Sequence, residues 1–186
     1  ALRARLAVHS LMIGGGVLCT VAGGAGLELA IATALAAAAA VALLAAALKA
    51  PVLPLAFGAV YVSLPFGSFI WLREATPDGR IVLLALLAIV WATDIAAYFA
   101  GRGFGGPLLS PKDSPNKTWN GALGALVCAG LAAAAVARAG EADIQGWIVI
   151  GLAMSIVAQA GDLFESRCKR IFGVKDASGI IPGHGG

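Results

Sequence analysis

The stretch RIVLLALLAIVWATDIAAYFA, residues 80–100, decides the fold of this chain. After Arg80 it holds one charged residue, Asp94, among side chains that are nearly all apolar. A helix needs about 20 such residues to cross the hydrocarbon core of a bilayer. The stretch is rich in Ala and Leu and does not alternate polar with apolar residues, as a strand of a membrane barrel would. It therefore predicts a membrane-spanning helix.

Five further apolar runs repeat this pattern, at about 6–26, 29–48, 52–72, 120–138 and 144–164. The whole chain is 60% hydrophobic and only 12% charged, whereas a soluble domain carries about 25% charged residues. We expect an all-α, polytopic transmembrane helix bundle with about six spans. Residues 1–186 would form a single integral-membrane domain. The alanine tract at 36–40 predicts close helix packing through small side chains.

Several other classes of protein are disfavoured. The three cysteines, Cys19, Cys128 and Cys168, lack the CxxC spacing of a zinc site and are odd in number, so no disulfide framework is indicated. The net charge is +3, but the basic residues alternate with apolar spans and do not gather on one soluble face, which argues against nucleic-acid binding. The chain begins with Ala1 and shows no signal peptide, and we expect a piece of a longer protein.

The distribution of cations predicts the orientation, because Lys and Arg favour cytoplasmic loops. With six spans and a cytoplasmic N-terminus, 10 of the 13 cations fall inside and only Arg73, Arg80 and Arg138 fall outside. This orientation places two polar segments, 101–119 and 165–186, on the cytoplasmic side. Both contain candidate site residues.

Asp94 is the first of these candidates. An ionisable side chain within a span costs at least roughly 2.5 kcal/mol if it faces lipid, so we expect it to face the bundle interior or a wet cavity. A structural hydrogen bond between helices is the simpler alternative. After Asp94 the helix is expected to run out into the glycine-rich segment 101–106.

The loop at 110–121 combines lysines, hydroxyls and an amide with turns set by Pro111 and Pro115. Such groups suit phosphate oxygens, particularly where a new helix begins near Thr118. Equally, a basic loop could serve only to orient the protein and to touch anionic lipid. Residue composition alone does not separate these two interpretations.

The last polar stretch begins with Asp162, which lies at the membrane end of the sixth run. Polar residues recur here at spacings of three and four, so much of the set shares one helix face. The set consists of Asp162, Glu165, Ser166, Lys169 and Arg170. Carboxylates followed by cations suit a Mg²⁺ ion beside a polyphosphate. An internal ion pair between Glu165 and Lys169 is the simpler interpretation of part of the pattern. Beyond it, the glycines around His184 would let backbone amides approach a ligand.

Several of these motifs together resemble one known family. Ser166-x-x-Lys169-Arg170, Lys175-Asp176 and Pro182-Gly183-His184-Gly185-Gly186 are similar to the signature of phosphatidate cytidylyltransferases, also called CDP-diacylglycerol synthases. The segments 94–105, 114–121 and 161–166 match other stretches of that family in order and spacing. The resemblance covers residues 91–186, while residues 1–90 agree only in being apolar. The family signature continues past His-Gly-Gly, so a second metal ligand is expected beyond Gly186.

The resemblance implies a reaction of CTP with phosphatidate that gives CDP-diacylglycerol and pyrophosphate. It implies Mg²⁺, with a second, monovalent cation left open, at the cytoplasmic face of a bacterial inner membrane. Asp162 is expected to hold the metal, and Asp176 to contact the metal or the ribose. Lys169, Arg170 and Lys175 are expected to neutralise phosphates, with Asp94 organising the site. The expected substrate contacts are Ser114, Asn116, Lys117, Thr118, His184 and Gly185.

Other functions stay open at this stage. A transporter would use Asp94 and Asp162 to line a pathway, although no inverted repeat is evident. A related CTP-dependent enzyme could act on another lipid acceptor, and a non-catalytic remnant is a third reading. Expected partners are CTP, phosphatidate and bilayer lipid, without nucleic acid, and small-residue helix faces would permit a homodimer.

Overall fold

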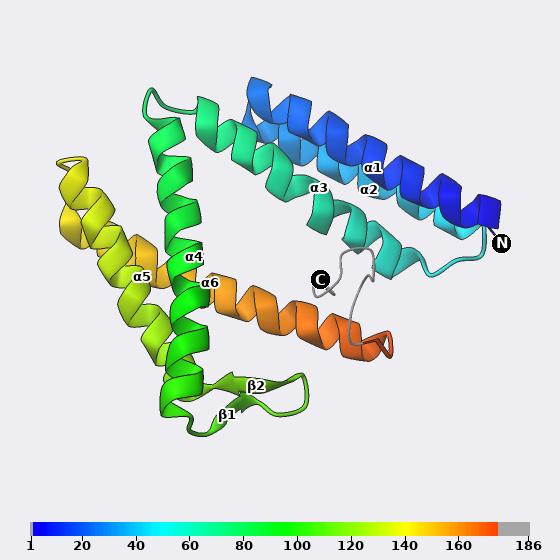
Figure 1. Cartoon of the computed structure of the whole chain (residues 1–186). Helices are drawn as coiled ribbons and strands as arrows, with labels where there is room; N and C mark the ends of the chain where they lie inside the picture. Colours follow the sequence, from blue (N-terminus) through cyan, green and yellow to red (C-terminus); the bar gives the residue numbers. More distant parts are fainter. Residues whose placement is uncertain (1, 175–186) are drawn as a thin grey trace. The chain divides into compact units, whose positions relative to one another are not determined.

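The computed structural model describes residues 2–174, which form six long helices and one two-stranded hairpin (Figure 1). The helices are α1 (Leu2–Ala25), α2 (Leu27–Ala47), α3 (Val52–Glu74), α4 (Gly79–Phe104), α5 (Trp119–Ala139) and α6 (Ile144–Ile171). Each is long and apolar enough to cross a membrane. The prediction of an all-α polytopic membrane protein with six spans is confirmed.

The contacts divide the chain into two units, at 1–84 and 85–186. In the first unit, α1, α2 and α3 pack against one another. Gly26, at φ 147°, is the single residue between α1 and α2, and its backbone conformation is one that side chains disfavour. The prediction of a single domain is not tested by this division.

Small residues make the contacts within the first unit. The buried stripe of α2 consists of Ala30, Ala34, Ala37, Val41 and Ala45, as its alanine-rich sequence predicts. A side chain at Gly23 would lie 2.1 Å from the carbonyl oxygen of Gly67, so α1 and α3 approach backbone to backbone. Large apolar side chains instead point outward, among them Leu43 and Leu53. This inversion of the usual soluble pattern suits helices whose outer surface is lipid.

The second unit contains the rest of α4, the hairpin, α5 and α6. Ile89 of α4 is fully buried with Ala129 and Ala133 of α5, and Trp147 and Met154 of α6 pack against this cluster. Gly151 lets α6 approach α5, because a side chain there would lie 2.6 Å from Cβ of Ala133. These contacts fix the three helices that carry the polar residues.

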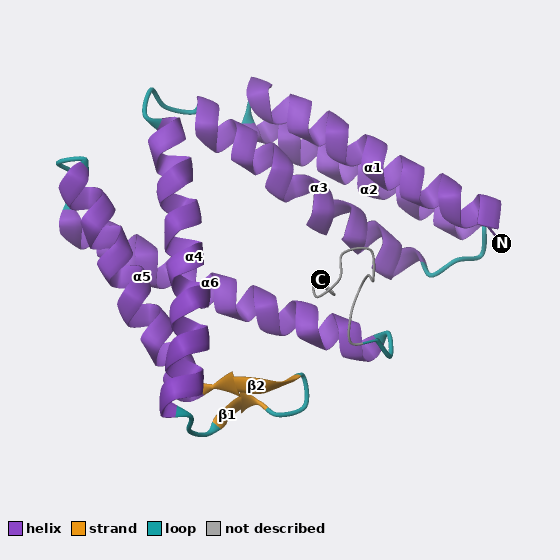
Figure 2. Ribbon diagram, in the orientation of Figure 1, coloured by secondary structure: helices purple, strands orange, loops and turns teal. Residues whose placement is uncertain are grey.

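A short antiparallel hairpin connects α4 to α5, with strands β1 (Leu108–Ser110) and β2 (Ser114–Thr118) (Figure 2). The sequence predicts a loop with turns at Pro111 and Pro115, whereas the structure forms paired strands on both sides of Pro111. The helix before it also differs from expectation, because α4 continues through Gly101 and ends only at Phe104. Gly105 and Gly106, at φ 60° and 102°, then turn the chain into the hairpin.

Candidate active site

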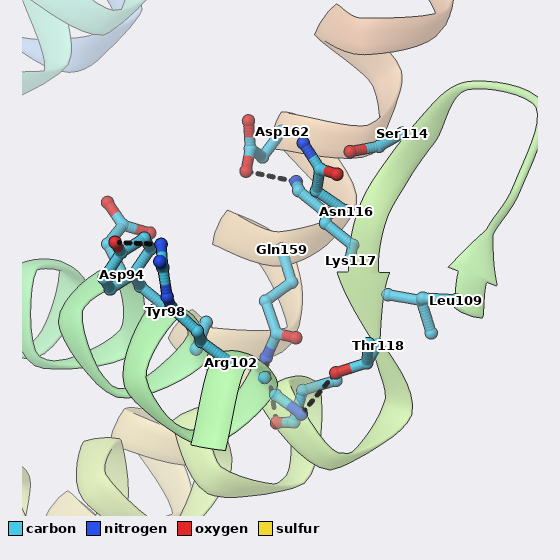
Figure 3. A pocket seen from close by; sticks show the side chains of 14 residues that line it. Asp94, Tyr98, Arg102, Leu109, Ser114, Asn116, Lys117, Thr118, Gln159 and Asp162 are labelled. Atoms are coloured by element: carbon cyan, nitrogen blue, oxygen red, sulfur yellow. Dashed lines mark hydrogen bonds and ion pairs between the residues drawn. The ribbon is translucent and has the colours of Figure 1, made fainter. Parts of the chain in front are cut away.

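A cavity of about 660 Å³ lies where α4, the hairpin, α5 and α6 meet (Figure 3). We call it the carboxylate pocket. Its lining residues are Asp94, Ala97, Tyr98, Gly101, Arg102, Leu109, Ser114, Asn116, Lys117, Thr118, Gly121, Ala122, Gln159 and Asp162. All of them belong to the second unit. The polar groups therefore come from segments separated by up to 68 positions but are gathered in one place.

The wall formed by α4 presents Asp94, Tyr98 and Arg102. These residues follow one another at intervals of four, which places them on one face of the helix. The Arg102 guanidinium donates a hydrogen bond of 3.1 Å to the Tyr98 hydroxyl and lies 5.9 Å from the centre of its ring. Tyr98 thus positions a cation within the same pocket as the Asp94 carboxylate.

The wall formed by α6 presents Gln159 and Asp162, which are three residues apart. The Gln159 amide nitrogen donates to the Ser155 hydroxyl at 3.2 Å and to the Ala122 carbonyl of α5 at 3.5 Å. Ser155 is fully buried, so this small network links α6 to α5 inside the unit. Gln159 consequently has a fixed position just before Asp162.

The hairpin supplies Lys117 through an irregularity in its register. Leu108 pairs with Thr118 and Ser110 pairs with Ser114, so three residues of β2 oppose a single residue of β1. Such bulges bend a strand and redirect its side chains. Pro115, which has no N–H to donate, lies in this bulge. Lys117 lies in it too, and its amine forms a charged hydrogen bond with the Asp162 carboxylate of α6.

Thr118 ends the hairpin and caps α5. Its hydroxyl oxygen accepts a hydrogen bond of 3.1 Å from the Gly121 backbone amide, as expected for a helix N-cap. Two glycines allow α4 to reach this point. A side chain at Gly121 would lie 2.8 Å from the Ala97 carbonyl, and one at Gly101 would lie 3.1 Å from the Thr118 hydroxyl. The backbone of the new helix therefore forms part of the pocket wall.

The pocket contains two carboxylates and two cations. Asp94 lines the same cavity as Asp162 and Lys117. The Asp162 side chain is 56% exposed although Lys117 contacts it, so part of the carboxylate stays accessible to a ligand. Opposed charges of this kind suit a ligand that brings both anionic oxygens and a bound cation.

The donor chemistry of the pocket fits Mg²⁺, which takes one or two protein carboxylates and completes its shell with water or phosphate oxygens. Asp162 and Asp94 supply such oxygens. Across residues 2–174, no three His, Cys, Asp or Glu side chains gather closely enough to enclose a metal by themselves. An ion in this pocket would therefore depend on ligands beyond these two carboxylates.

Comparison with known proteins places the chain in a family. A profile described as the Cytidylyltransferase family matches residues 4–186. The chain belongs to the Cytidylyltransferase family. It is 48% identical over 136 residues to a protein of Brucella suis named phosphatidate cytidylyltransferase, covering 70% of this chain and 49% of that protein. A protein of the same name from Haemophilus influenzae is 43% identical over 114 residues, covering 58% of this chain and 40% of that protein.

A third relative with this name, from Staphylococcus aureus, is 41% identical over 120 residues, covering 63% of this chain and 46% of that protein. The chain thus spans about half the length of the curated relatives it matches. No solved structure matched it. The family predicted from the sequence motifs is confirmed.

The structure of this cytidylyltransferase-family chain gathers six of the predicted site residues in the carboxylate pocket: Asp94, Asp162, Ser114, Asn116, Lys117 and Thr118. Lys169 lies further along α6, where its amine is 2.8 Å from the Glu165 carboxylate. Arg170 lines a second cavity. The predicted residues Lys175, Asp176, His184 and Gly185 lie outside the described residues, so their roles stay predictions.

Sequence reasoning did not assign site roles to Arg102 and Gln159, which also line the pocket. A signal for each was present. Arg102 follows Asp94 by eight residues and Tyr98 by four, and Gln159 precedes Asp162 by three. The glycine-rich composition of residues 101–106 predicts that the helix ends before Arg102, whereas α4 continues to Phe104. Gln159 was hidden within the sixth apolar run.

Proposed function

We propose that this cytidylyltransferase-family chain forms part of an enzyme that transfers the cytidylyl group of CTP to phosphatidate, giving CDP-diacylglycerol and pyrophosphate. The names of the relatives and their identity over 136 residues support this reaction class. The observation that carries the proposal is the Lys117–Asp162 contact, which joins a cation and an accessible carboxylate inside one cavity. A phosphate with a bound metal needs both kinds of group.

The reaction would begin with attack by a phosphate oxygen of phosphatidate on the α-phosphorus of CTP. A bond from that oxygen to the α-phosphorus forms, the bond from the α-phosphorus to the oxygen that joins it to the β-phosphorus breaks, and pyrophosphate leaves with that oxygen and the electron pair. Because the attacking oxygen is already anionic, no serine or cysteine nucleophile is required. The protein's task is to hold two anions together and to offset their repulsion.

The residues of the pocket suit that task. Lys117 and Arg102 are cations that can bind phosphate oxygens, and Arg102 is held in place by Tyr98. The Ser114 and Thr118 hydroxyls and the Asn116 amide provide further hydrogen-bonding groups on the hairpin. Gln159 has its amide nitrogen directed to Ser155 and Ala122, so it maintains the position of the α6 wall.

Asp162 and Asp94 would hold Mg²⁺, and Asp176 would contact either the metal or the ribose. The bound ion would neutralise phosphate charge in the transition state and orient the phosphates. Lys117, which contacts Asp162, keeps that carboxylate directed towards the hairpin side of the pocket. Lys169, Arg170, Lys175, His184 and Gly185 complete the set of residues proposed to contact the nucleotide.

The proposed location is a bacterial inner membrane, with the N-terminus and the carboxylate pocket on the cytoplasmic side. The excess of cations in the segments that would face the cytoplasm supports this orientation. At such a boundary, a water-soluble nucleotide can meet a lipid whose acyl chains remain in the bilayer. The small-residue helix faces also make a homodimer feasible.

The test is a transfer assay with the purified protein in lipid vesicles, using radiolabelled CTP and phosphatidate. We expect label to enter the organic-solvent phase together with release of one pyrophosphate per lipid product, only when Mg²⁺ is present. Asp162→Asn should lower turnover by a factor on the order of 100 or more, because a neutral amide is a poor ligand for Mg²⁺.

The matched control is Glu165→Gln, which removes one carboxylate from the same helix outside the pocket lining. It should fold and insert like Asp162→Asn and keep most of the activity, since exposed helical ion pairs contribute little. Near-normal turnover by Asp162→Asn would remove this residue from the metal role. Label transfer to a different lipid acceptor, with none to phosphatidate, would overturn the proposed substrate.

A further inference from the structure

A second cavity, of about 420 Å³, lies between the turn of the hairpin and the end of α6. We call it the basic pocket. Lys112 and Asp113 come from the turn, and Arg167, Arg170 and Ile171 come from the last turns of α6. Its three cations and one carboxylate leave a net charge of +2 at the mouth of a concave surface.

The basic pocket is distinct from the carboxylate pocket, with which it shares no lining residue. Asp162 and Arg170 are eight positions apart in α6, which corresponds to about 12 Å along the helix axis. Arg167 and Ile171 also lie on a different side of α6 from Asp162, given the helical rotation of about 100° per residue. The same two elements, the hairpin and α6, thus contribute to two separate cavities.

The one carboxylate of the basic pocket is already engaged. The Ser110 hydroxyl donates a hydrogen bond of 3.0 Å to the Asp113 carboxylate. Lys112 and Arg167 are exposed. Arg170 donates to the Val174 carbonyl at 3.4 Å, a contact that uses one of its five N–H groups. The other N–H groups of Arg170 are not used by this contact.

Large apolar side chains border the cations. Ile171, which lines the pocket, is 72% exposed, and the next residue, Phe172, is 68% exposed. Ile171 is the last residue of the candidate membrane span of α6, and Phe172 follows it directly. Cations next to exposed apolar side chains at the end of a span match the chemistry of a lipid headgroup region, where phosphate lies beside the acyl boundary. A nucleotide phosphate would gain nothing from Ile171 or Phe172.

From this arrangement we infer that the basic pocket binds the phosphate of an anionic bilayer phospholipid, at a site separate from the carboxylate pocket. Lys112 and Arg167 would contact the phosphate from opposite walls, with the apolar side chains beside the glycerol and upper acyl chain. The inference concerns a lipid site on the protein and holds whether or not the cytidylyl transfer proposed above is correct.

The test uses the whole protein in a neutral detergent and measures binding of phosphatidylglycerol by native mass spectrometry, with phosphatidylcholine as the neutral lipid. The double variant Lys112→Gln, Arg167→Gln should weaken phosphatidylglycerol binding by about 25-fold, at about fivefold for each cation removed near an anionic headgroup. Phosphatidylcholine binding should stay unchanged. Should the double variant fail to fold, Arg167→Gln alone should weaken binding about fivefold.

Two controls make the result specific. Arg138→Gln removes an exposed cation from the last turn of α5, outside the basic pocket, and should leave phosphatidylglycerol binding unchanged. Lys112→Arg with Arg167→Lys keeps both charges and should retain most of the affinity. Unchanged phosphatidylglycerol binding in the double variant, or an equal loss in Arg138→Gln, would overturn the inference. A double variant that loses CTP affinity but keeps phosphatidylglycerol would assign the pocket to a nucleotide instead.

Discussion

Lys117 of β2 donates a charged hydrogen bond to Asp162 of α6, 45 positions further along the chain. Neither side chain is fully buried, at 27% exposed for Lys117 and 56% for Asp162. Ion pairs with this exposure contribute about 0 to 1 kcal/mol to stability. The contact therefore does little to hold the unit together, and its significance lies in the position that it gives to both charges.

This relationship predicts that Lys117→Met will reduce function far more than stability. We expect kcat/KM for CTP to fall about 100-fold, because a cation that offsets phosphate charge is lost. The free energy of unfolding should change by less than about 1 kcal/mol. Transfer kinetics and thermal unfolding of the same preparation measure the two effects.

The double variant Lys117→Met, Asp162→Asn checks whether the two residues act together. Coupled residues give non-additive effects, so the double variant should lose much less than the product of the single losses. Lys117→Arg, which keeps the charge, should recover part of the activity. Losses that simply multiply would show that the two side chains act independently.

The close contact between α5 and α6 predicts a stability defect for Gly151→Ala. The added methyl would lie 2.6 Å from Cβ of Ala133 and 2.9 Å from the Ala129 carbonyl, so the helices must separate. We expect a loss of about 1 to 3 kcal/mol, measured as a lower midpoint of unfolding in detergent.

Gly161→Ala is the matched control, because it makes the same substitution in the same helix at a place where, among residues 2–174, no atom outside the adjoining stretch of α6 lies within 4 Å of the new methyl. It should be neutral or slightly stabilising, since alanine favours a helix over glycine by up to about 1 kcal/mol. An equal decrease in both variants would mean that glycine serves here for a reason other than close packing.

Thr118 and Asp143 are both helix caps, and comparing their variants distinguishes an effect on stability from an effect on function. Thr118 accepts a hydrogen bond from the Gly121 amide at the start of α5, and Asp143 accepts bonds from the Gln145 and Gly146 amides at the start of α6. Replacing either by alanine should cost about 1 kcal/mol. Only Thr118→Ala should also weaken CTP binding or turnover, because Thr118 lines the carboxylate pocket. Equal activity in the two variants would limit Thr118 to capping.

The proposed orientation predicts opposite accessibility for the two ends of α5. In a background in which Cys19, Cys128 and Cys168 are replaced by alanine, Lys112→Cys should react with an impermeant maleimide only in inside-out vesicles. Ala142→Cys should react only from the outer face of intact spheroplasts. The reverse pattern would place the N-terminus and the carboxylate pocket outside.

The membrane spans could be predicted from the sequence because length and apolar composition determine them almost directly. The structure at the ends of the spans could not be predicted in this way. Arg102 and Gly101 were assigned to an exit loop because glycines usually end helices, yet Gly101 stays helical where α4 approaches Thr118. Tertiary packing explains why a glycine occupies this helical position, and the pattern of a single sequence does not reveal that packing.

The candidate site, too, could be predicted only in part from the sequence. Asp94, Lys117 and Asp162 were recognised as candidates because charge is conspicuous in apolar surroundings and because their motifs resemble a family. Their assembly into one cavity depends on contacts between α6 and β2 that no local pattern specifies. Gln159 is an example of a residue whose role the sequence patterns do not reveal. Its amide donates hydrogen bonds to Ser155 and Ala122, and only the fold identifies these partners.

The bulge in β2 makes the length of the hairpin as important as its composition. Side chains alternate between the two faces of a strand, so removal of one residue from the bulge would turn those that follow it to the opposite face. Deleting Pro115 or Asn116 would shift Lys117 relative to Ser114 and to its pairing with β1. Substitutions in this segment can preserve the Lys117–Asp162 contact, whereas a single-residue deletion would abolish it. A segment that looks like an ordinary surface turn should therefore reject the insertions and deletions that such turns usually accept.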